Sequence, residues 1–145
     1  MTPRIALTLA AALLFVATAA GAFGAHALKA RLDSDALAIW QTAVQYHVWH
    51  ALGLLAVGLL LIHKPDSAAL GLSGWLFVTG VVLFSGSLYA LSLTGVRGLG
   101  VVTPIGGIAF LGAWAAMAWA AWLGASVAMN TASIRSSFTI SSSEG

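Results

Sequence analysis

The sequence predicts an all-α protein, a four-helix transmembrane bundle, on three observations. Of the 145 residues, 60% are hydrophobic and 7% are charged, whereas a soluble domain is typically about 25% charged. All charged side chains fall outside four long apolar stretches, each long enough to cross the hydrocarbon core as a helix. Unpaired backbone groups are too costly in lipid for any fold other than helices or a closed barrel. Residues 1–129 are therefore predicted to form one transmembrane domain, with spans over residues 5–28, 44–62, 70–93 and 101–129.

The first span has a competing interpretation as a signal peptide. Arg4 precedes an Ala/Leu-rich run, and Ala17-Thr18-Ala19 resembles a cleavage site. The apolar run continues without a break past this point and is longer than the apolar region of an ordinary signal peptide. We expect a retained helix, with cleavage within the first 20 or so residues as the alternative.

The longest connection, loop 1 over residues 29–43, carries a helix signal of its own. Asp33-Ser34-Asp35 is a favourable cluster for a helix N-cap. Leu37, Trp40 and Val44 then recur at helical spacing. We expect a short interfacial helix in loop 1 that runs into the second span.

The other connections are short, and the C-terminal segment is polar. Pro65 in loop 2 ends the second helix, and the glycines of loop 3, residues 94–100, indicate a tight turn. Pro104 suits the start of the fourth helix, where a missing N–H costs nothing. Residues 130–145 are Ser-rich with little to bury, so we expect a disordered tail.

The charges determine orientation weakly. Lysine and arginine are equally divided between the two sides of the membrane, and the free amino group tips the balance towards cytoplasmic termini. Trp40 and Trp49 are expected at the membrane interface on the loop 1 side, as part of an aromatic belt.

Small residues at four-residue spacing predict where helices approach one another, because close backbone contact drives helix association in lipid. Such spacing occurs in the first and fourth spans, which we expect to be in contact. A dimer interface is the alternative, and packing within the bundle is the simpler interpretation. The predicted helix-packing positions are Ala17, Gly21, Gly24, Gly106, Gly107, Gly112, Ala116, Ala120 and Gly124.

The polar side chains of the spans gather in the half of the membrane next to loops 1 and 3. Polar groups in a membrane are costly and usually face the bundle interior or water. Any site is therefore expected in this half. The candidate polar site comprises His26, Tyr46, His47, His50, Ser85, Tyr89 and Ser92.

The histidines allow a cofactor as an alternative. His47 and His50 are three residues apart on a helix, so both imidazoles can point towards one partner. Together with His26 they could form a three-histidine site for a divalent metal, and two of them could be axial ligands of a haem. Hydrogen bonding between helices is the simpler interpretation. We expect no cofactor, and keep a metal- or haem-binding module through His26 and His50, with His47, as the alternative.

A second alternative is a conduit for protons or a small solute. Ser85, Tyr89 and Ser92 form a polar stripe at helical spacing, which suits either a conduit or hydrogen bonds between helices. Transporters and pumps generally place an acidic or basic residue in a span, and none occurs here. The sequence also contains no nucleophile elbow, phosphate loop, paired carboxylates or basic patch. We expect neither an enzyme nor a nucleic-acid partner.

Four segments in series, together with Trp114, resemble the YgdD-like family of small bacterial inner-membrane proteins of unknown function. The resemblance covers residues 1–125 in the right order and spacing. The segments are Gly21-Ala22-Phe23-Gly24-Ala25-His26, Tyr46-His47-Val48-Trp49-His50-Ala51-Leu52, Leu83-Phe84-Ser85-Gly86-Ser87-Leu88-Tyr89 and Thr103-Pro104-Ile105-Gly106-Gly107.

This resemblance implies a four-span membrane protein with no established reaction. Relatives often have glutamine at the place of His47, which weakens a three-histidine metal site. They are also more basic in loop 2 and at the C-terminus, which supports cytoplasmic termini. We therefore expect a non-enzymatic structural or accessory protein of the inner membrane. Its expected role is in envelope integrity or in a larger membrane complex, with lipid, other membrane proteins or itself as partners. The resemblance places Gly24, His26, Tyr46, His50, Ser85, Tyr89, Pro104, Gly106 and Gly107 at the family's characteristic positions.

Overall fold

The computed structural model describes the backbone of residues 1–141 and the side chains of residues 1–124. All elements in this described part are helical, and they group into four helices long and apolar enough to cross a membrane. The all-α prediction is confirmed. In chain order the elements are α1 (Pro3–Phe23), η1 (Gly24–Leu28), α2 (Ser34–His63), α3 (Ala68–Gly80), η2 (Val81–Ser85), α4 (Gly86–Thr94), η3 (Arg97–Val101) and α5 (Thr103–Ser141).

The helix ends follow local signals in the sequence. Asp33 caps α2, and its Oδ1 atom accepts a hydrogen bond from the Ala36 amide at 2.8 Å. The helix predicted in loop 1 is therefore the first part of α2 itself. Ser67 caps α3 in the same way. Gly95 follows α4 with φ of 70°, a left-handed conformation that glycine adopts without strain.

The two long helices at the ends of the chain differ from expectation in detail. α1 continues into the π-helical turn η1, and together they form a candidate span over Pro3–Leu28. The α5 backbone continues as helix beyond the predicted span, as far as Ser141. Side chains after Gly124 and all of residues 142–145 lie outside the described part, and the disorder expected for residues 130–145 stays a prediction.

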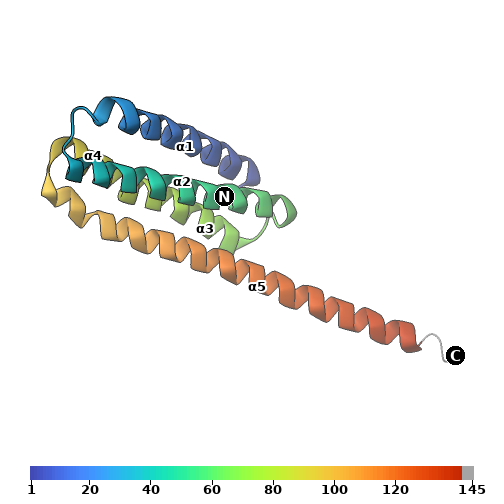
Figure 1. The fold of residues 1–145 in the computed structure, drawn as a ribbon. Coiled ribbons are helices and arrows are strands. Elements are labelled where there is room, and N and C mark those ends of the chain that lie inside the picture. Colours follow the sequence, from blue (N-terminus) through green and yellow to red (C-terminus); the bar gives the residue numbers. More distant parts are fainter. Residues whose placement is uncertain (142–145) are drawn as a thin grey trace.

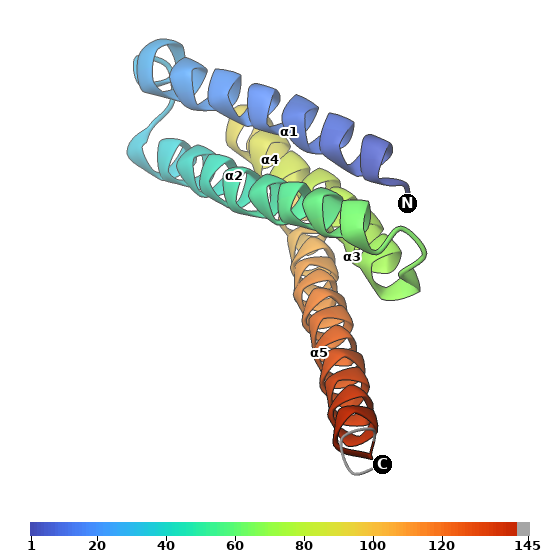
Figure 2. The same ribbon diagram turned by 90° about the vertical axis from the view of Figure 1, so that its right-hand side faces the viewer.

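The four spans form an open row rather than a closed square. α1 packs along α2, α2 packs against α3, η2 and α4, and α5 packs against α3 and η2. In both Figure 1 and Figure 2, α1 and α5 lie on opposite sides of the pair formed by α2 and α3. The predicted contact between the first and fourth spans is wrong. Small residues show that a helix face can approach a neighbour, but they do not specify which neighbour.

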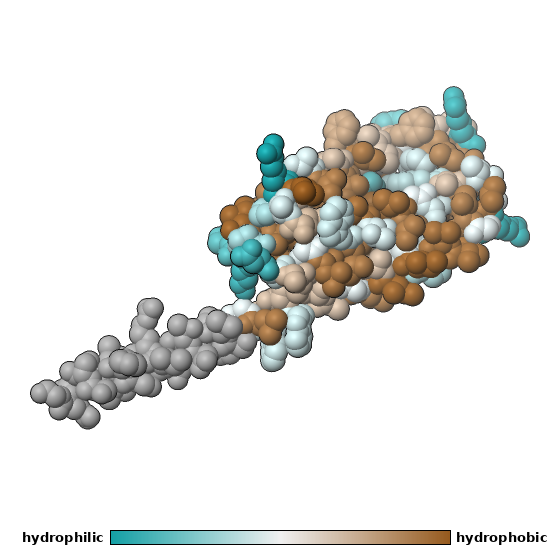
Figure 3. Space-filling view, turned by 180° about the vertical axis from the view of Figure 1, so that it is seen from behind, coloured by the Kyte–Doolittle hydropathy of each residue, from teal (hydrophilic) through white to brown (hydrophobic). Residues whose placement is uncertain are grey.

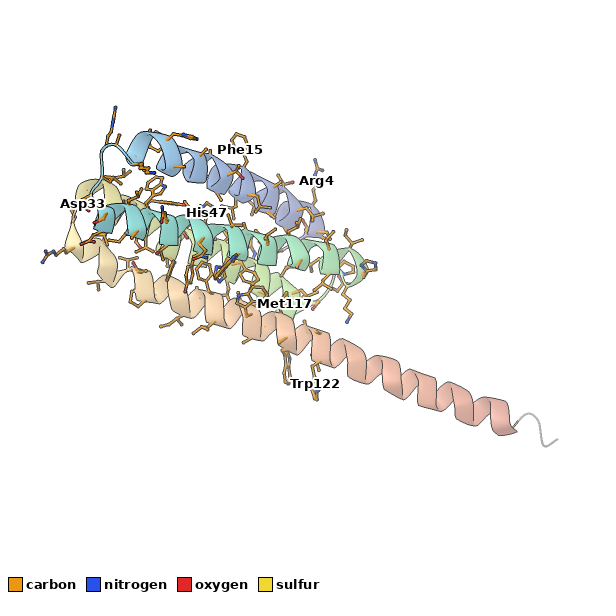
Figure 4. All side chains as sticks on the ribbon, viewed as in Figure 1. Arg4, Phe15, Asp33, His47, Met117 and Trp122 are labelled. Carbon is orange, nitrogen blue, oxygen red and sulfur yellow. The ribbon has the colours of Figure 1, made fainter. Side chains whose placement is uncertain are left out.

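The interior is built from small residues on α1 and larger ones on α2 and α3. Ala6, Ala10 and Ala17 are fully buried on α1. Towards the loop 2 end the buried cluster contains Leu54, Val57, Leu61 and Phe77. In Figure 3, hydrophobic surface covers the middle of the bundle and hydrophilic side chains gather at its ends. Figure 4 shows Phe15 and Trp122 pointing away from the bundle, as lipid-facing side chains do.

Candidate functional site

His47 lies at the centre of a polar core between α2 and α4. Its side chain is only 3% exposed, and its Nδ1 atom lies 3.3 Å from the Tyr89 hydroxyl; Figure 4 locates it on α2. The Nε2 atom of His47 and the Oγ atom of Ser85 are buried and have no hydrogen-bond partner among the described residues. We call His47, Ser85 and Tyr89 the polar core.

His50 faces a different environment. Its ring is 7% exposed and stacks on Phe110 of α5, with 3.4 Å between the ring centroids and 11° between the planes. Its Nδ1 atom donates to the Tyr46 carbonyl at 2.7 Å, because a carbonyl oxygen can only accept. The ring forms part of the wall of a groove of about 380 Å³ between α2, η2 and α5.

We call this hollow the His50 groove. Its walls are apolar and aromatic, and the Tyr46 ring stacks on Phe84 with 4.5 Å between centroids. The lining residues are Tyr46, His50, Phe84, Pro104, Gly107, Ile108, Phe110, Leu111 and Trp114.

The π-helical turn η2 separates the polar core from the groove. Phe84 lines the groove, whereas the next residue, Ser85, is buried in the polar core. Gly106 allows α5 to reach this turn, because a Cβ atom there would collide with the backbone of Phe84. π-helical turns occur frequently at functional sites.

Several other polar side chains of the spans form hydrogen bonds between helices. The Ser92 hydroxyl donates to the Ala36 carbonyl at 2.7 Å, which joins α4 to the first turn of α2. The Ser87 and Thr103 hydroxyls lie 2.8 Å apart, which joins α4 to the start of α5. In the opposite half of the bundle, the Ser73 hydroxyl donates to the Ala113 carbonyl at 2.8 Å.

Trp40 joins α1 to α2 and has a structural role that was not predicted from the sequence. It is 6% exposed, and its indole N–H donates to the Ala20 carbonyl at 3.0 Å. Gly24 makes room for the indole, since a Cβ atom there would come within 2.6 Å of Nε1. Trp40 is enclosed between α1 and α2 and does not face lipid, because α2 begins early enough to bring this side chain against Gly24 of η1. Trp49 is 52% exposed.

The three histidines are not brought together. His26 is exposed on η1, away from the buried imidazoles of α2. Within the described residues, no group of three His, Cys, Asp or Glu side chains is placed to hold a metal ion. The alternative of a three-histidine metal site is therefore wrong. The first and second spans meet through Trp40 and small residues, which leaves His26 on the outer surface.

A separate hollow of about 360 Å³ lies at the loop end of the bundle. Asp33, Asp35 and Arg97 contribute charged groups to its lining, beside Ser92. These side chains are exposed, apart from the buried Ser92, and they mark where the bundle meets water.

The predicted helix-packing positions face helices other than those expected, since the first and fourth spans do not pack on each other. A Cβ atom at Gly21 would lie 3.5 Å from Val44 of α2, and one at Gly112 would lie 3.3 Å from Leu76 of α3. Gly107 faces the Phe84 ring, and Gly124 faces Lys64. Ala17 and Ala120 are buried, and Ala116 is half-buried.

The sequence analysis missed the aromatic walls of the groove. Phe84, Phe110 and Trp114 resemble lipid-facing side chains in the sequence, and only the approach of α5 to η2 makes them a lining. The available signal was Gly106-Gly107, which allows another backbone to come close, three residues before Phe110.

Comparisons with known proteins agree on one family. The family described as "Protein of unknown function (DUF423)" matches residues 20–107. The UPF0382 membrane protein YwdK of Bacillus subtilis is 43% identical over 111 residues, which cover 77% of this chain and 90% of the relative.

Two further relatives come from other bacteria. A UPF0382 membrane protein of Staphylococcus epidermidis is 44% identical, over 77% of this chain and 89% of the relative. One of Haemophilus influenzae is 41% identical with the same coverage of both chains. No solved structure matches the chain. The chain has four long apolar helices, and its match covers nearly the whole length of relatives that are named membrane proteins. It therefore belongs to the DUF423/UPF0382 family of membrane proteins of unknown function.

Proposed function

We propose that this protein is a non-enzymatic accessory protein of the bacterial inner membrane, which supports envelope integrity or a larger membrane complex. One observation carries the proposal. The polar side chains between the helices are used mainly to join helices: Trp40 to α1, Ser73 to α5, and Ser92 to α2. Such bonds fix the arrangement of the spans.

The outer edge of α5 is the surface that we propose meets a partner. α5 packs mainly on α3 and η2. Away from the His50 groove it exposes large apolar side chains, and Trp119 and Trp122 are 57% and 62% exposed. Lipid covers such a face in an isolated protein, and another membrane helix can replace it by close packing.

We extend the proposal to orientation and to the finer family grouping. Both termini lie on one side of the membrane in a four-span chain, and we assign that side to the cytoplasm because the free amino group tips an otherwise equal division of lysine and arginine. The resemblance to YgdD-like proteins supports the same placement in the inner membrane. A reporter fused after residue 145, active only in the periplasm, should be inactive; an active fusion would reverse the orientation.

Photo-crosslinking tests the partner surface. A photoreactive amino acid replaces Trp122 on α5 or, as the matched control, Phe15 on the lipid-facing side of α1, which is 76% exposed. The proposal expects a discrete protein adduct from position 122 in native membranes and lipid adducts alone from position 15. The adduct should also disappear on dilution into detergent before irradiation.

A deletion strain supplies the second test. The proposal expects increased sensitivity to detergent or osmotic shock, restored by the intact gene. The absence of a protein adduct at position 122, together with an envelope indistinguishable from wild type, would contradict the accessory role.

A further inference from the structure

The His50 groove combines an apolar wall with one unpaired hydrogen-bond acceptor. The Nδ1–H of His50 is engaged by the Tyr46 carbonyl at 2.7 Å, so in the neutral ring the Nε2 atom carries the lone pair. No hydrogen bond to Nε2 is formed by the described residues. Nε2 is also not among the fully enclosed polar atoms, unlike Nε2 of His47. A buried side chain thus presents an acceptor to the groove.

The depth of His50 makes this acceptor unusual. His50 lies near the middle of α2, a helix of 30 residues that crosses the whole bilayer. Water is scarce at this depth, and an unpaired polar atom in hydrocarbon is costly. An acyl chain in the groove would leave the acceptor unpaired. A ligand with an O–H group would pair with it.

The walls restrict the ligand further. Tyr46, Phe84, Phe110 and Trp114 present rings around the same hollow. Aromatic rings pack favourably in offset or edge-to-face arrangements, which favours a ligand that is itself a ring. The groove volume of about 380 Å³ lies within the range of small-molecule sites. The groove lies between spans and is only partly enclosed, so a ligand dissolved in the bilayer can enter it.

We propose that the His50 groove binds the headgroup of a membrane hydroquinone, with a ring hydroxyl donating to Nε2 of His50 and the ring held between the aromatic walls. The proposal concerns binding alone and goes beyond the accessory role. Such a site prefers the reduced to the oxidised ligand, because a hydroquinone has O–H donors for Nε2 whereas a quinone has carbonyl acceptors only.

Binding of a short-chain benzohydroquinone tests the proposal. The full-length protein, purified into lipid nanodiscs, is titrated without oxygen by equilibrium dialysis against ubiquinol-1, ubiquinone-1 and the dimethyl ether of the hydroquinone. We expect saturable binding of the hydroquinone, and binding of the other two weaker by about tenfold, which is the contribution of one hydrogen bond. Equal affinity for all three compounds would overturn the proposal.

A matched pair of histidine variants locates the site. H50F keeps a ring against Phe110 and removes the acceptor. H63F makes the same chemical change at an exposed position, where His63 Nδ1 also bonds the carbonyl four residues earlier in its helix, at 3.3 Å. We expect H50F to weaken hydroquinone binding about tenfold and H63F to leave it unchanged. Equal binding by both variants would show that His50 is not the acceptor.

A third variant covers the case in which H50F does not fold. Gly107→Leu fills the groove without altering His50, and its Cβ atom meets only the Phe84 ring, at 3.8 Å. We expect this variant to fold with wild-type helicity and to lose hydroquinone binding. If wild type is instead a dimer that Gly107→Leu dissociates, with no hydroquinone bound, a second copy occupies the groove and the proposal is wrong. Retention of hydroquinone binding by Gly107→Leu would also overturn it.

Discussion

His47 and His50 are one helical turn apart on α2, yet they belong to different parts of the molecule. His47 faces α4, where Tyr89 meets its Nδ1 atom and protein encloses its Nε2 atom. His50 faces α5, where its Nδ1 atom is paired within α2 and its ring lies beside a groove. The rotation between positions three residues apart is enough to separate them, because α4 and α5 contact α2 on different sides. Residue type and spacing therefore do not decide whether two histidines share a partner.

The largest expected effect comes from breaking the contact that separates the two environments. Gly106→Ala places a Cβ atom against the Phe84 backbone, which must move for α5 to stay in place. We expect a loss of about 3 kcal/mol in the free energy of unfolding, at the upper end of the range for overpacking. Reversible unfolding in mixed micelles measures it.

The neighbouring glycine is the control. Gly107→Ala meets the Phe84 ring at an ordinary contact distance of 3.8 Å. Alanine favours the helix over glycine, so this variant should be neutral or more stable by up to about 1 kcal/mol. Equal destabilisation by the two variants would contradict the close approach of α5 to η2 at Gly106.

Truncation of His47 should open the polar core. His47→Ala leaves a cavity and removes the partner of the Tyr89 hydroxyl, and we expect a loss of about 2 kcal/mol in stability. The exposed His63 serves as the comparison, because His63→Ala should change the free energy of unfolding by less than about 0.5 kcal/mol. Thermal unfolding of both variants in the same detergent measures the two losses in stability. Similar losses for His47→Ala and His63→Ala would contradict the buried position of His47.

Trp40 closes the polar core on the side of α1, with its ring 4.6 Å from that of Tyr89. Trp40→Phe keeps most of the packing and removes the hydrogen bond to the Ala20 carbonyl. We expect a cost of about 1 kcal/mol in unfolding free energy. Trp49→Phe, at a half-exposed position, should be close to neutral. The same cost for both would remove the structural role given to Trp40.

The smallest effect concerns the tyrosines of the two environments. Tyr89→Phe removes the hydroxyl that meets His47, and hydrogen bonds between membrane helices average about 0.6 kcal/mol. Tyr46→Phe removes a hydroxyl for which the described residues provide no hydrogen-bond partner, and it should leave stability unchanged. A double-mutant cycle of Tyr89→Phe with His47→Ala isolates the pair. A coupling energy of zero would show that the 3.3 Å contact contributes nothing.

The fold was predictable because it depends on the length of apolar segments and on residue types at helix ends, both of which can be read from the sequence. Apolar length gives the spans, Asp33 gives the start of α2, and the glycines of loop 3 indicate the turn in which Gly95 ends α4. Pairing of the spans was not predictable. Gly21 and Gly112 each allow a close approach, yet they face α2 and α3, and nothing in four-residue spacing distinguishes one apolar neighbour from another.

The candidate site was predicted in part. The half of the membrane that holds His47, His50 and Tyr89 follows from threading four helices alternately. The division of this half into a closed core and an open groove depends on the close approach of α5 to η2 at Gly106, which brings Phe110 and Trp114 beside Phe84. The glycines show that a backbone can come close there, but they do not say which one. The groove walls therefore could not be predicted from the sequence.

The most direct test of the two environments is the ¹⁵N spectrum of histidine-labelled protein in lipid nanodiscs, with H47Q and H50F to assign the resonances. The structure predicts that His50 is the tautomer with the proton on Nδ1, and that its Nε2 resonance shifts when ubiquinol-1 is added. It also predicts that the His47 resonances do not respond. A proton on Nε2 of His50, or equal responses of both histidines, would contradict the separation of a closed polar core from an open groove.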